Sequence, residues 1–197
     1  GDHRDLPSFP TRRSSDLTIA EEAMSSPPGS NGIVYHPYLL GEDAPYWDPE
    51  LRGSFVGLSA KHNRSDLARA VYEGTAYALR DAQETFLDLN SGFQKYIFVG
   101  GGTKNEIWLS IIADVLRLDG EVPLQSDASF GAALLSGVGT DVFASLEEAL
   151  RICVKPMRKI RHNERNSRIY DGLFSQYKLI QQKLGGFYAL RRRGTDE

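Results

Sequence analysis

The residues best suited to chemistry lie in the stretch Gly100–Asn105, which reads G-G-G-T-K-N. Before it, the β-favouring apolar run Tyr96–Val99 predicts a buried strand. After it, an amphipathic segment predicts a helix that opens at Asn105 and is closed by Gly120. Glycine lets backbone approach a ligand closely, and the N–H groups at a helix start favour an anion or a polar acceptor. One interpretation of the stretch is therefore a phosphate or nucleotide contact.

A purely structural tight turn is the other interpretation of this stretch. The pattern is neither G-x-G-x-x-G nor the P-loop pattern G-x-x-x-x-G-K-[ST], so no nucleotide fingerprint decides between the two. From these residues alone both interpretations stay open.

Other reactive residue types offer less. Glu42 and Asp43 are adjacent carboxylates that could act as an acid/base pair, although such pairs in loops are usually just solvated. The four histidines are scattered without metal-ligand spacing, so we predict no metal site on this chain. Cys153 is the single cysteine and has no basic neighbour beyond Lys155, and no G-x-S-x-G sequence occurs, which argues against a nucleophile.

The elements that must position the glycine stretch alternate between strands and helices, which predicts an α/β or mixed layered fold. The predicted strands are Ile33–Leu40, Ser54–Leu58, Tyr96–Val99 and Glu121–Leu124. The first of them leads into a loop, and the last is predicted to be an edge strand. The predicted helices are Thr18–Met24, a long segment from Ser65 to Gly92, Phe130–Val138, a segment opening at the capping-box sequence Ser145–Glu148, and Asn163–Leu184.

The long segment after Ser65 carries strong helix signals. Ser65 is the predicted N-cap and Asp66 the first-turn acid. The predicted buried stripe consists of Leu67, Val71, Gly74, Ala78, Ala82, Phe86 and Leu89. Glycine in mid-helix costs about 1 kcal/mol relative to alanine, so we predict that Gly74 packs closely against a neighbour.

Length and composition indicate a globular protein that contacts neither nucleic acid nor membrane. The chain has 197 residues, of which 41% are hydrophobic and 25% are charged. The net charge of -3 and the pI near 5.9 argue against nucleic acid, which needs a concentrated basic surface. No apolar run is long enough to span a bilayer, and the start lacks the pattern of a secretory signal. With a single cysteine, a cytoplasmic protein is expected.

Three stretches together resemble the FGGY family of carbohydrate kinases. They are Pro37–Pro49 with Arg52–Gly53, Gly53–Leu58 with Asp66–Glu73, and Gly100–Gly102 with Asn105 and Ala113–Leu116. The first is similar to the family's P-Y-L-x-G-E-R-x-P-x-x-D-P segment. The second resembles the signature of the family's second domain along its whole length and is the most specific. The resemblance runs from about Glu21 to Leu184.

This resemblance implies the α/β fold of an actin-like, ribonuclease-H-like ATPase, with the chain as its second domain, incomplete at its N-terminal side. In the family ATP binds largely on the second domain and the sugar largely on the first, and Mg²⁺ and a carboxylate base assist the transfer. Carried over by position, Gly101 and Asn105 would contact the nucleotide, while Gly100 and Gly102 would shape the turn. The implied cofactors are ATP and Mg²⁺, and the partner is a small-molecule sugar or polyol.

The sequence departs from the family pattern at two positions. Asp43 stands where an arginine usually follows Gly-Glu. Ser126 stands where the family often has a glutamate ahead of the small-residue helix, although Asp127 is adjacent. The resemblance places the phosphate-holding loop, the sugar-binding residues and the catalytic aspartate upstream of this chain. No catalytic residue is therefore assigned here, and we expect the chain alone to be inactive.

The expected organisation has three parts: residues 1–17 as a disordered or non-native segment, 18–188 as a partial FGGY C-terminal, nucleotide-binding domain, and 189–197 as a disordered basic tail. The resemblance favours ATP-dependent transfer of phosphate to a ketopentose or related polyol, in the manner of xylulokinases. The alternatives are a gluconate or glycerol kinase, since Ala44–Pro49 also resembles the glycerol enzymes, and a non-catalytic actin-like nucleotide-binding module. A homodimer of the full-length enzyme stays open.

Overall fold

The structure is a computed structural model that describes residues 19–88, 96–125 and 127–193. Its contacts group the chain into two compact units, one made of the residues up to Ala78 and from Ile169 onward, the other of Leu79–Arg168. Helices α2 and α6 both run through the two units, and the single domain predicted for residues 18–188 stays a prediction. The predicted segment 1–17 lies outside the described residues.

The first unit contains a small antiparallel sheet. Residues 19–24 are helical, as predicted, and the short 3₁₀ helix η1 (Ser30–Gly32) precedes the sheet. Strand β1 (Val34–His36) pairs with β2 (Ser54–Val56), so that Val34 lies opposite Val56. Both strands fall within the predicted ranges. β1 ends directly before Pro37, because proline has no N–H to donate to a ladder.

Helix α2 (Arg64–Asp88) starts with a reciprocal cap that differs from the predicted one. The Asn63 side chain accepts a hydrogen bond from Ser65 N at 2.8 Å, and the Asp66 carboxylate accepts one from Asn63 N at 3.0 Å. Asn63 therefore takes the capping role predicted for Ser65, because its amide oxygen reaches the first free N–H groups. Asp66 is a first-turn acid, as predicted. The predicted end at Gly92 lies outside the described residues.

The buried face of α2 combines polar and apolar residues, where a purely apolar stripe was predicted. Of that stripe, Gly74 is buried and Leu67, Ala78 and Ala82 are half-buried, whereas Val71 and Phe86 are exposed and Leu89 lies outside the described residues. The buried residues of the helix include Asp66, Arg69, Ala70, Glu73, Ala76, Tyr77 and Asp81. Glu73 accepts hydrogen bonds from Gly29 N at 2.9 Å, Ser30 Oγ at 2.7 Å, Arg69 Nε at 2.7 Å and Tyr170 Oη at 2.9 Å. Four donors bond to this carboxylate, so neither of its oxygens is left unsatisfied in the core.

Gly74 lies where β1 touches α2. A Cβ atom at Gly74 would stand 2.2 Å from the carbonyl oxygen of Tyr35, far inside van der Waals contact. The prediction of close packing at this glycine is confirmed, since any side chain there would push the strand off the helix.

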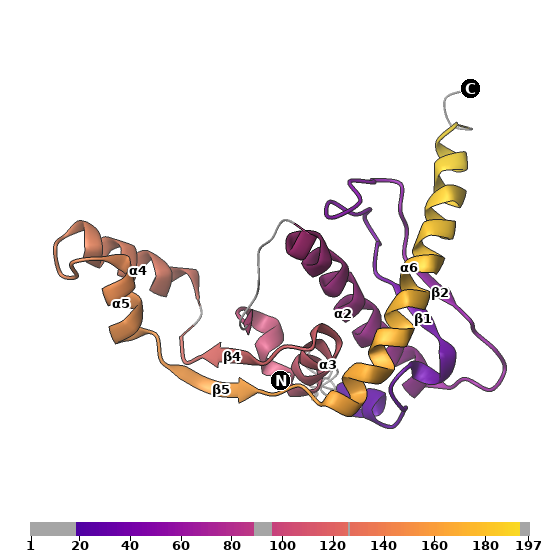
Figure 1. Cartoon of the computed structure of the whole chain (residues 1–197), viewed down its shortest axis with the longest axis horizontal. Coiled ribbons are helices and arrows are strands. Elements are labelled where there is room, and N and C mark those ends of the chain that lie inside the picture. The colour runs from indigo at the N-terminus through magenta and orange to yellow at the C-terminus, as the bar shows by residue number, and fades with distance from the viewer. Residues whose placement is uncertain (1–18, 89–95, 126, 194–197) are drawn as a thin grey trace, which may run out of the picture. The chain divides into compact units, whose positions relative to one another are not determined.

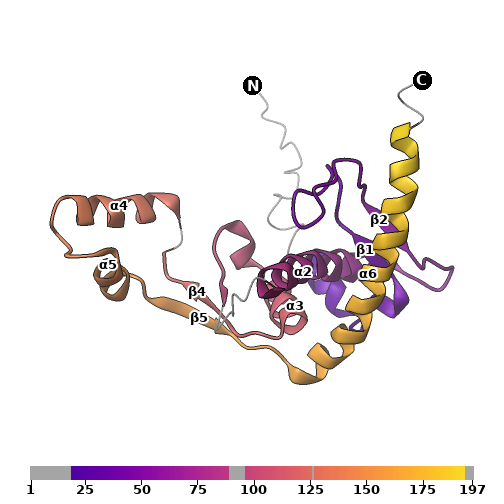
Figure 2. The same cartoon turned by 45° about the horizontal axis from the view of Figure 1, so that its top comes forward.

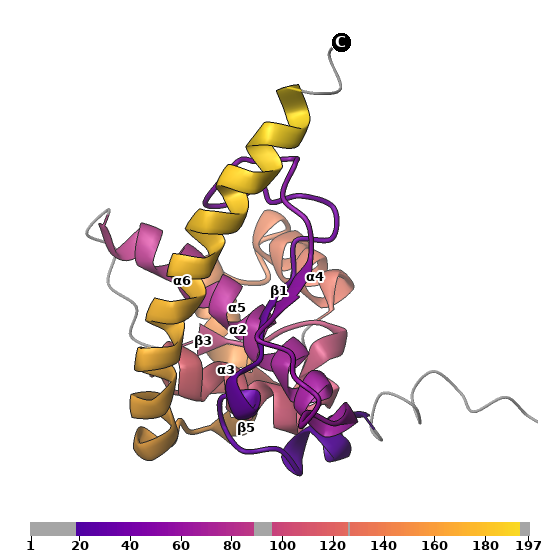
Figure 3. The same ribbon diagram turned by 90° about the vertical axis from the view of Figure 1, so that its right-hand side faces the viewer.

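Helix α6 (Glu164–Arg193) packs an aromatic face into the first unit, next to β1 (Figure 3). Tyr170, Phe174 and Tyr177 of this helix are almost fully buried, as the predicted face requires. The helix continues to Arg193, so the prediction of a disordered tail from residue 189 is wrong for residues 189–193. Gly185 and Gly186 do not stop it, and Ala189, Leu190 and Arg191 beyond them are good helix formers. Residues 194–197 lie outside the described part.

His36 is buried between β2 and α6. Its ring stacks on Tyr177 with centroids 4.4 Å apart, Nε2 lies 3.2 Å from the Tyr177 carbonyl oxygen, and Nδ1 lies 3.3 Å from Ser54 Oγ. A neutral ring that donates from Nε2 and accepts at Nδ1 satisfies both partners.

We expect the unit to lose stability in mild acid through this histidine. Burial lowers the pKa of His36 below its usual 6.5, and the hydrogen bond to the Tyr177 carbonyl only partly opposes this. A lowered folded-state pKa contributes stability above the unfolded-state pKa that is lost as the pH falls through and below it, with a slope of up to about 1.4 kcal/mol per pH unit. Urea unfolding from about pH 8 to about pH 5 measures this. His36→Asn should flatten the slope, and an equally steep slope in that variant would contradict the assignment.

The second unit contains a mixed three-stranded sheet, of which Figure 1 shows β4 and β5 side by side. Strand β3 (Tyr96–Ile97) runs parallel to β4 (Gly120–Pro123), which pairs antiparallel with β5 (Pro156–Ile160). The prediction that Glu121–Leu124 forms an edge strand is wrong, because β5, which was not predicted, pairs with its other side. Pro123 falls where the register shifts, a position that tolerates its missing N–H.

Three helices complete the second unit, α3 (Glu106–Leu116), α4 (Ala128–Gly139) and α5 (Leu146–Cys153). α4 and α5 pack together as a helical pair (Figure 2). Asp127 caps α4 by accepting from Phe130 N at 2.8 Å, and Ser145 caps α5 by accepting from Glu148 N at 3.2 Å, as its capping-box sequence predicted. Ser126 lies outside the described residues.

Gly120 does not close α3, contrary to the prediction. The helix ends at Leu116 with Arg117 in the left-handed region at φ 54°, and Gly120 is the first residue of β4. A Cβ atom at Gly120 would stand 2.1 Å from the Phe98 ring, so this glycine provides space between neighbouring strands.

Apolar side chains remain exposed in the second unit, among them Leu135 and Val142 of the α4–α5 pair and Val99 beside the glycine stretch. Across the part of the chain that the structure describes, no helix is both long and apolar enough to cross a bilayer.

Candidate functional site

The glycine stretch forms a tight turn between β3 and α3. The predicted strand Tyr96–Val99 is shorter than expected, although Phe98 N still donates to Glu121 O at 2.8 Å. Gly100 then turns the chain at φ 86° and ψ -173°, a conformation essentially restricted to glycine. A short 3₁₀ helix, η2 (Gly101–Lys104), leads to Asn105. The predicted strand, glycine turn and helix are thus all present.

Hydrogen bonds within the turn fix its shape. The Gly100 carbonyl oxygen accepts from Thr103 N at 3.2 Å and from Thr103 Oγ1 at 2.7 Å. Asn105 N donates to the Gly102 carbonyl at 3.0 Å. These bonds hold the turn in one conformation without a ligand, which reduces the entropy that a ligand must remove on binding.

Asn105 is the N-cap of α3, as predicted. Its side-chain oxygen accepts from Trp108 N at 3.0 Å. The Trp108 ring covers Gly102, where a Cβ atom would stand 2.2 Å from that ring. Gly102 therefore shapes the turn by admitting Trp108. The predicted contact between Asn105 and a nucleotide stays a prediction.

Gly100 and Gly101 present bare backbone. A Cβ atom at either position would have nothing within 4 Å, so the space next to them is open. Lys104 is exposed and lies in the last turn of η2. A backbone without side chains, a helix start and an ammonium group together suit an anionic ligand.

Arg158 of β5 is the residue of this site that the sequence did not reveal. Its guanidinium donates to the Thr103 carbonyl oxygen and forms an ion pair with the Glu106 carboxylate. Thr103 belongs to the turn and Glu106 to the first turn of α3, so one side chain joins both. This contact was hidden because Arg158 and Thr103 are 55 positions apart in the sequence and because β5 was not predicted.

An apolar cavity of about 480 Å³ lies next to the turn within the second unit. Its lining includes the aromatic residues Tyr96, Phe98 and Trp108 together with Gly102 and Thr103 of the turn. Burial raises the pKa of Tyr96 to about 12, so its hydroxyl stays protonated at neutral pH. The cavity can take apolar or aromatic groups, and it offers no acid or base for neutral pH.

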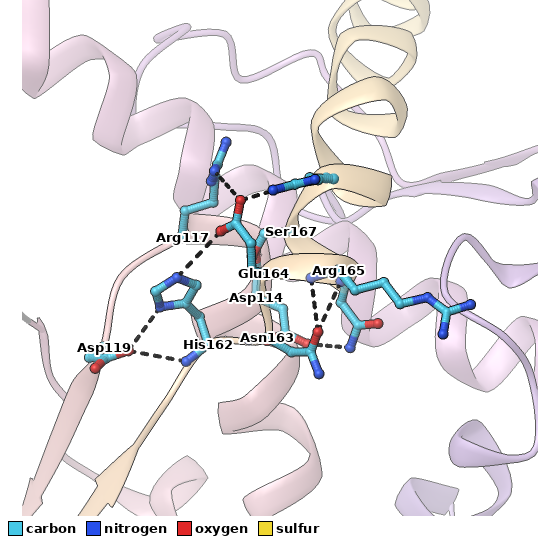
Figure 4. Close-up of polar contacts among 10 residues, drawn as sticks. Asp114, Arg117, Asp119, His162, Asn163, Glu164, Arg165 and Ser167 are labelled. Carbon is cyan, nitrogen blue, oxygen red and sulfur yellow. Dashed lines mark hydrogen bonds and ion pairs between the residues drawn. The ribbon is translucent and has the colours of Figure 1, made fainter.

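A second polar cluster joins the connection between α3 and β4 to the one between β5 and α6 (Figure 4). His162 Nδ1 lies 2.8 Å from Asp119 Oδ1 and His162 Nε2 lies 3.8 Å from Glu164 Oε2, while Arg117 pairs with Glu164 at 2.9 Å. The hydrogen bond from His162 lowers the pKa of Asp119, and those from Arg168 and Arg117 lower that of Glu164. Both ring nitrogens of His162 face carboxylates that stay ionised. We therefore interpret the cluster as structural, with the role of holding the α3–β4 and β5–α6 connections together.

Asp114, within the third family-like stretch, stabilises the start of α6. Its carboxylate accepts from Asn163 N at 2.6 Å and from Asn166 Nδ2 at 2.8 Å, and its carbonyl accepts from Ser167 Oγ at 2.7 Å (Figure 4). The residue is buried, and the two donors to its carboxylate explain why an acid is tolerated on an otherwise apolar helix face.

The other candidates from the sequence are Glu42, Asp43 and Cys153. Glu42 and Asp43 belong to a loop of the first unit, where Glu42 Oε1 accepts from Ala44 N at 3.3 Å. Cys153, a free cysteine, is half-buried at the end of α5. Within residues 19–88, 96–125 and 127–193, no group of three or more His, Cys, Asp or Glu side chains could hold a metal ion.

Comparisons with known proteins match the chain to a family and to solved structures. Residues 8–140 match the family model described as FGGY family of carbohydrate kinases, C-terminal domain. The chain is 33% identical over 166 residues to the xylulose kinase of Staphylococcus epidermidis. The matched region covers 84% of this chain and 34% of that protein.

Among solved structures, the ligand-bound xylulose kinase from Lactobacillus acidophilus is similar with a TM-score of 0.81 at 27% identity, over 87% of this chain and 35% of that one. The gluconate kinase from the same organism is similar with a TM-score of 0.83 at 25% identity, over 93% of this chain and 37% of that one. The chain thus spans about a third of the length of the relatives it matches.

Proposed function

The chain belongs to the FGGY family of carbohydrate kinases, as part of the family's C-terminal domain, and on this basis we propose that it is the nucleotide-binding part of an ATP-dependent sugar kinase. The intact enzyme transfers the γ-phosphate of ATP to a hydroxyl group of a ketopentose or a related polyol, as a xylulose kinase does. The xylulose kinases among its relatives support this substrate class.

The observation that carries the proposal is the bare, pre-shaped turn at Gly100–Gly102. Open space beside Gly100 and Gly101 admits a ligand to the backbone, and the start of α3 favours its negative charge. We assign Gly101 and Asn105 to contact with the nucleotide, and Gly100 and Gly102 to the shape of the turn. Lys104 adds a positive charge at the same place.

The residues of the transfer step itself are not assigned to this chain. Phosphoryl transfer depends on positioning, on a base for the attacking hydroxyl and on Mg²⁺ that neutralises phosphate charge. Mg²⁺ in kinases is held largely by phosphate oxygens, water and one or two carboxylates, so the glycine turn need not contribute a ligand. Accordingly, we propose that the chain alone does not catalyse transfer.

The test is a sugar panel with the intact kinase that carries this chain, in ATP and Mg²⁺. We expect the highest kcat/KM with xylulose or another ketopentose and no turnover by the isolated chain. A preference for gluconate or glycerol at least tenfold over every ketopentose would reject the substrate class. Turnover by the isolated chain would reject the proposal that this chain alone does not catalyse transfer.

Gluconate or glycerol phosphorylation is the second candidate. Its support is the structural similarity to the gluconate kinase and the Ala44–Pro49 sequence, which resembles the glycerol enzymes. Asp43, in place of the arginine that is usual in the family, leaves the sugar preference open. A module that binds nucleotide but transfers nothing would bind ATP in the same experiment and phosphorylate no sugar.

A further inference from the structure

We propose that Arg158 is a positioning residue of the nucleotide site, which holds the glycine turn in place and cancels the charge of Glu106. This inference rests on the proposed function, because it assumes that the phosphates of a nucleotide lie at the turn.

The contacts of Arg158 join three elements of the second unit. From β5, the guanidinium donates to the Thr103 carbonyl at the end of the turn and pairs with Glu106 at the start of α3. Its side chain is 26% exposed, whereas that of Glu106 is 71% exposed. The arginine side chain is therefore mostly covered by protein, whereas the glutamate side chain is mostly exposed to solvent.

The sheet fixes the place of Arg158. The β4–β5 register puts Arg158 opposite Val122, which is almost fully buried. β4 in turn pairs with β3, the strand that leads into the glycine turn. Because β3, β4 and β5 belong to one hydrogen-bonded sheet, the contact from Arg158 ties the turn to that sheet.

Arginine suits the task better than lysine. Its planar guanidinium presents several donors in a fixed geometry, so one nitrogen can serve the carbonyl while another pairs with the carboxylate. A lysine ammonium on β5 can satisfy one of these partners but does not fix both at once.

The second effect of Arg158 is that its positive charge compensates the negative charge of Glu106. Glu106 lies in the first turn of α3, where a negative charge stabilises the helix but repels a phosphate at the same helix start. The ion pair with Arg158 offsets that repulsion at short range. Without the arginine, an incoming nucleotide would meet an uncompensated carboxylate.

The test compares variants of the intact kinase by calorimetric binding of a non-hydrolysable ATP analogue, by KM for ATP and for sugar, and by melting temperature. Arg158→Met should raise the dissociation constant and the KM for ATP roughly tenfold, which is the size expected from a lost charge-assisted contact, with the KM for sugar unchanged. Arg158→Lys should fall between Arg158→Met and the wild type. Lys159→Met, on the same strand and 4.0 Å from Glu121, is the matched control and should bind like the wild type.

A second variant separates the two effects of Arg158. Arg158→Met combined with Glu106→Gln should recover part of the lost affinity, because the repulsion is gone while the Thr103 carbonyl remains unheld. Hydrogen exchange without nucleotide should be faster at the amides of residues 103–108 in Arg158→Met than in Lys159→Met.

Each outcome has one meaning. ATP affinity unchanged in Arg158→Met, an equal loss in Lys159→Met, or equal exchange rates in the two variants would overturn the role of Arg158 while leaving the proposed function intact. A wild-type kinase that does not bind the ATP analogue would instead overturn the proposed function, and this inference with it.

Discussion

Replacing Gly101 by valine should weaken ATP binding by roughly 100-fold, about 2.7 kcal/mol, without unfolding the intact kinase. A Cβ atom at this position meets nothing within 4 Å, so the protein itself has room for the side chain. The same space is where we place the nucleotide, and a branched side chain there keeps phosphates away from the backbone N–H groups. Calorimetric titration with ATP and a melting curve measure binding and folding separately.

Gly172→Val is the matched control for this prediction. Gly172 is an exposed glycine of α6 whose Cβ atom would also meet nothing within 4 Å. This variant should bind ATP as the wild type does. If a folded Gly101→Val protein binds ATP within about twofold of the wild type, the nucleotide does not lie at this turn.

The second large effect is expected on stability, at the buried carboxylate of Glu73. Replacing Glu73 by leucine should lower the free energy of unfolding by roughly 3–5 kcal/mol, because it leaves the Arg69 charge uncompensated. Arg69 lies 2.7 Å from Glu73, with side chains only 5% and 2% exposed. Since domains are stable by only about 5–15 kcal/mol, such a loss is severe. Urea unfolding followed by circular dichroism measures it.

Two further variants show whether the buried charge causes the effect. Combining Glu73→Leu with Arg69→Met should recover part of the loss, because removing both charges leaves neither one unpaired. Glu84→Gln, at the more exposed Arg80–Glu84 pair of the same helix, should cost less than about 1 kcal/mol. A double variant no more stable than Glu73→Leu alone would contradict this explanation.

The parts of the fold that sequence could predict depend on local chemistry. Asn105 and Ser145 mark helix starts because their side chains reach N–H groups only three residues ahead. The glycine turn was predictable because only glycine adopts the backbone angles of Gly100 at low cost. The close packing at Gly74 followed from the cost of glycine in a helix.

The parts that sequence did not predict depend on partners distant in the chain. β5 contains Pro156 and charged residues without a clear alternation, and it exists because β4 offers it a free side. Because β5 was not predicted from the sequence, β4 was assigned to the edge of the sheet and Arg158 was not identified. On α2, apolar periodicity could not reveal that Glu73 is buried, because two of its donors, Ser30 and Tyr170, lie in other elements.

Hydrogen exchange of the intact kinase with and without a saturating non-hydrolysable ATP analogue tests the central claim most directly. That claim is that the nucleotide lies against the bare backbone of the glycine turn at Gly101 and against the start of α3. We predict slower exchange at the amides of residues 100–108 when the analogue is bound. Binding that slows exchange only in other segments, with the amides of residues 100–108 unchanged, would contradict it.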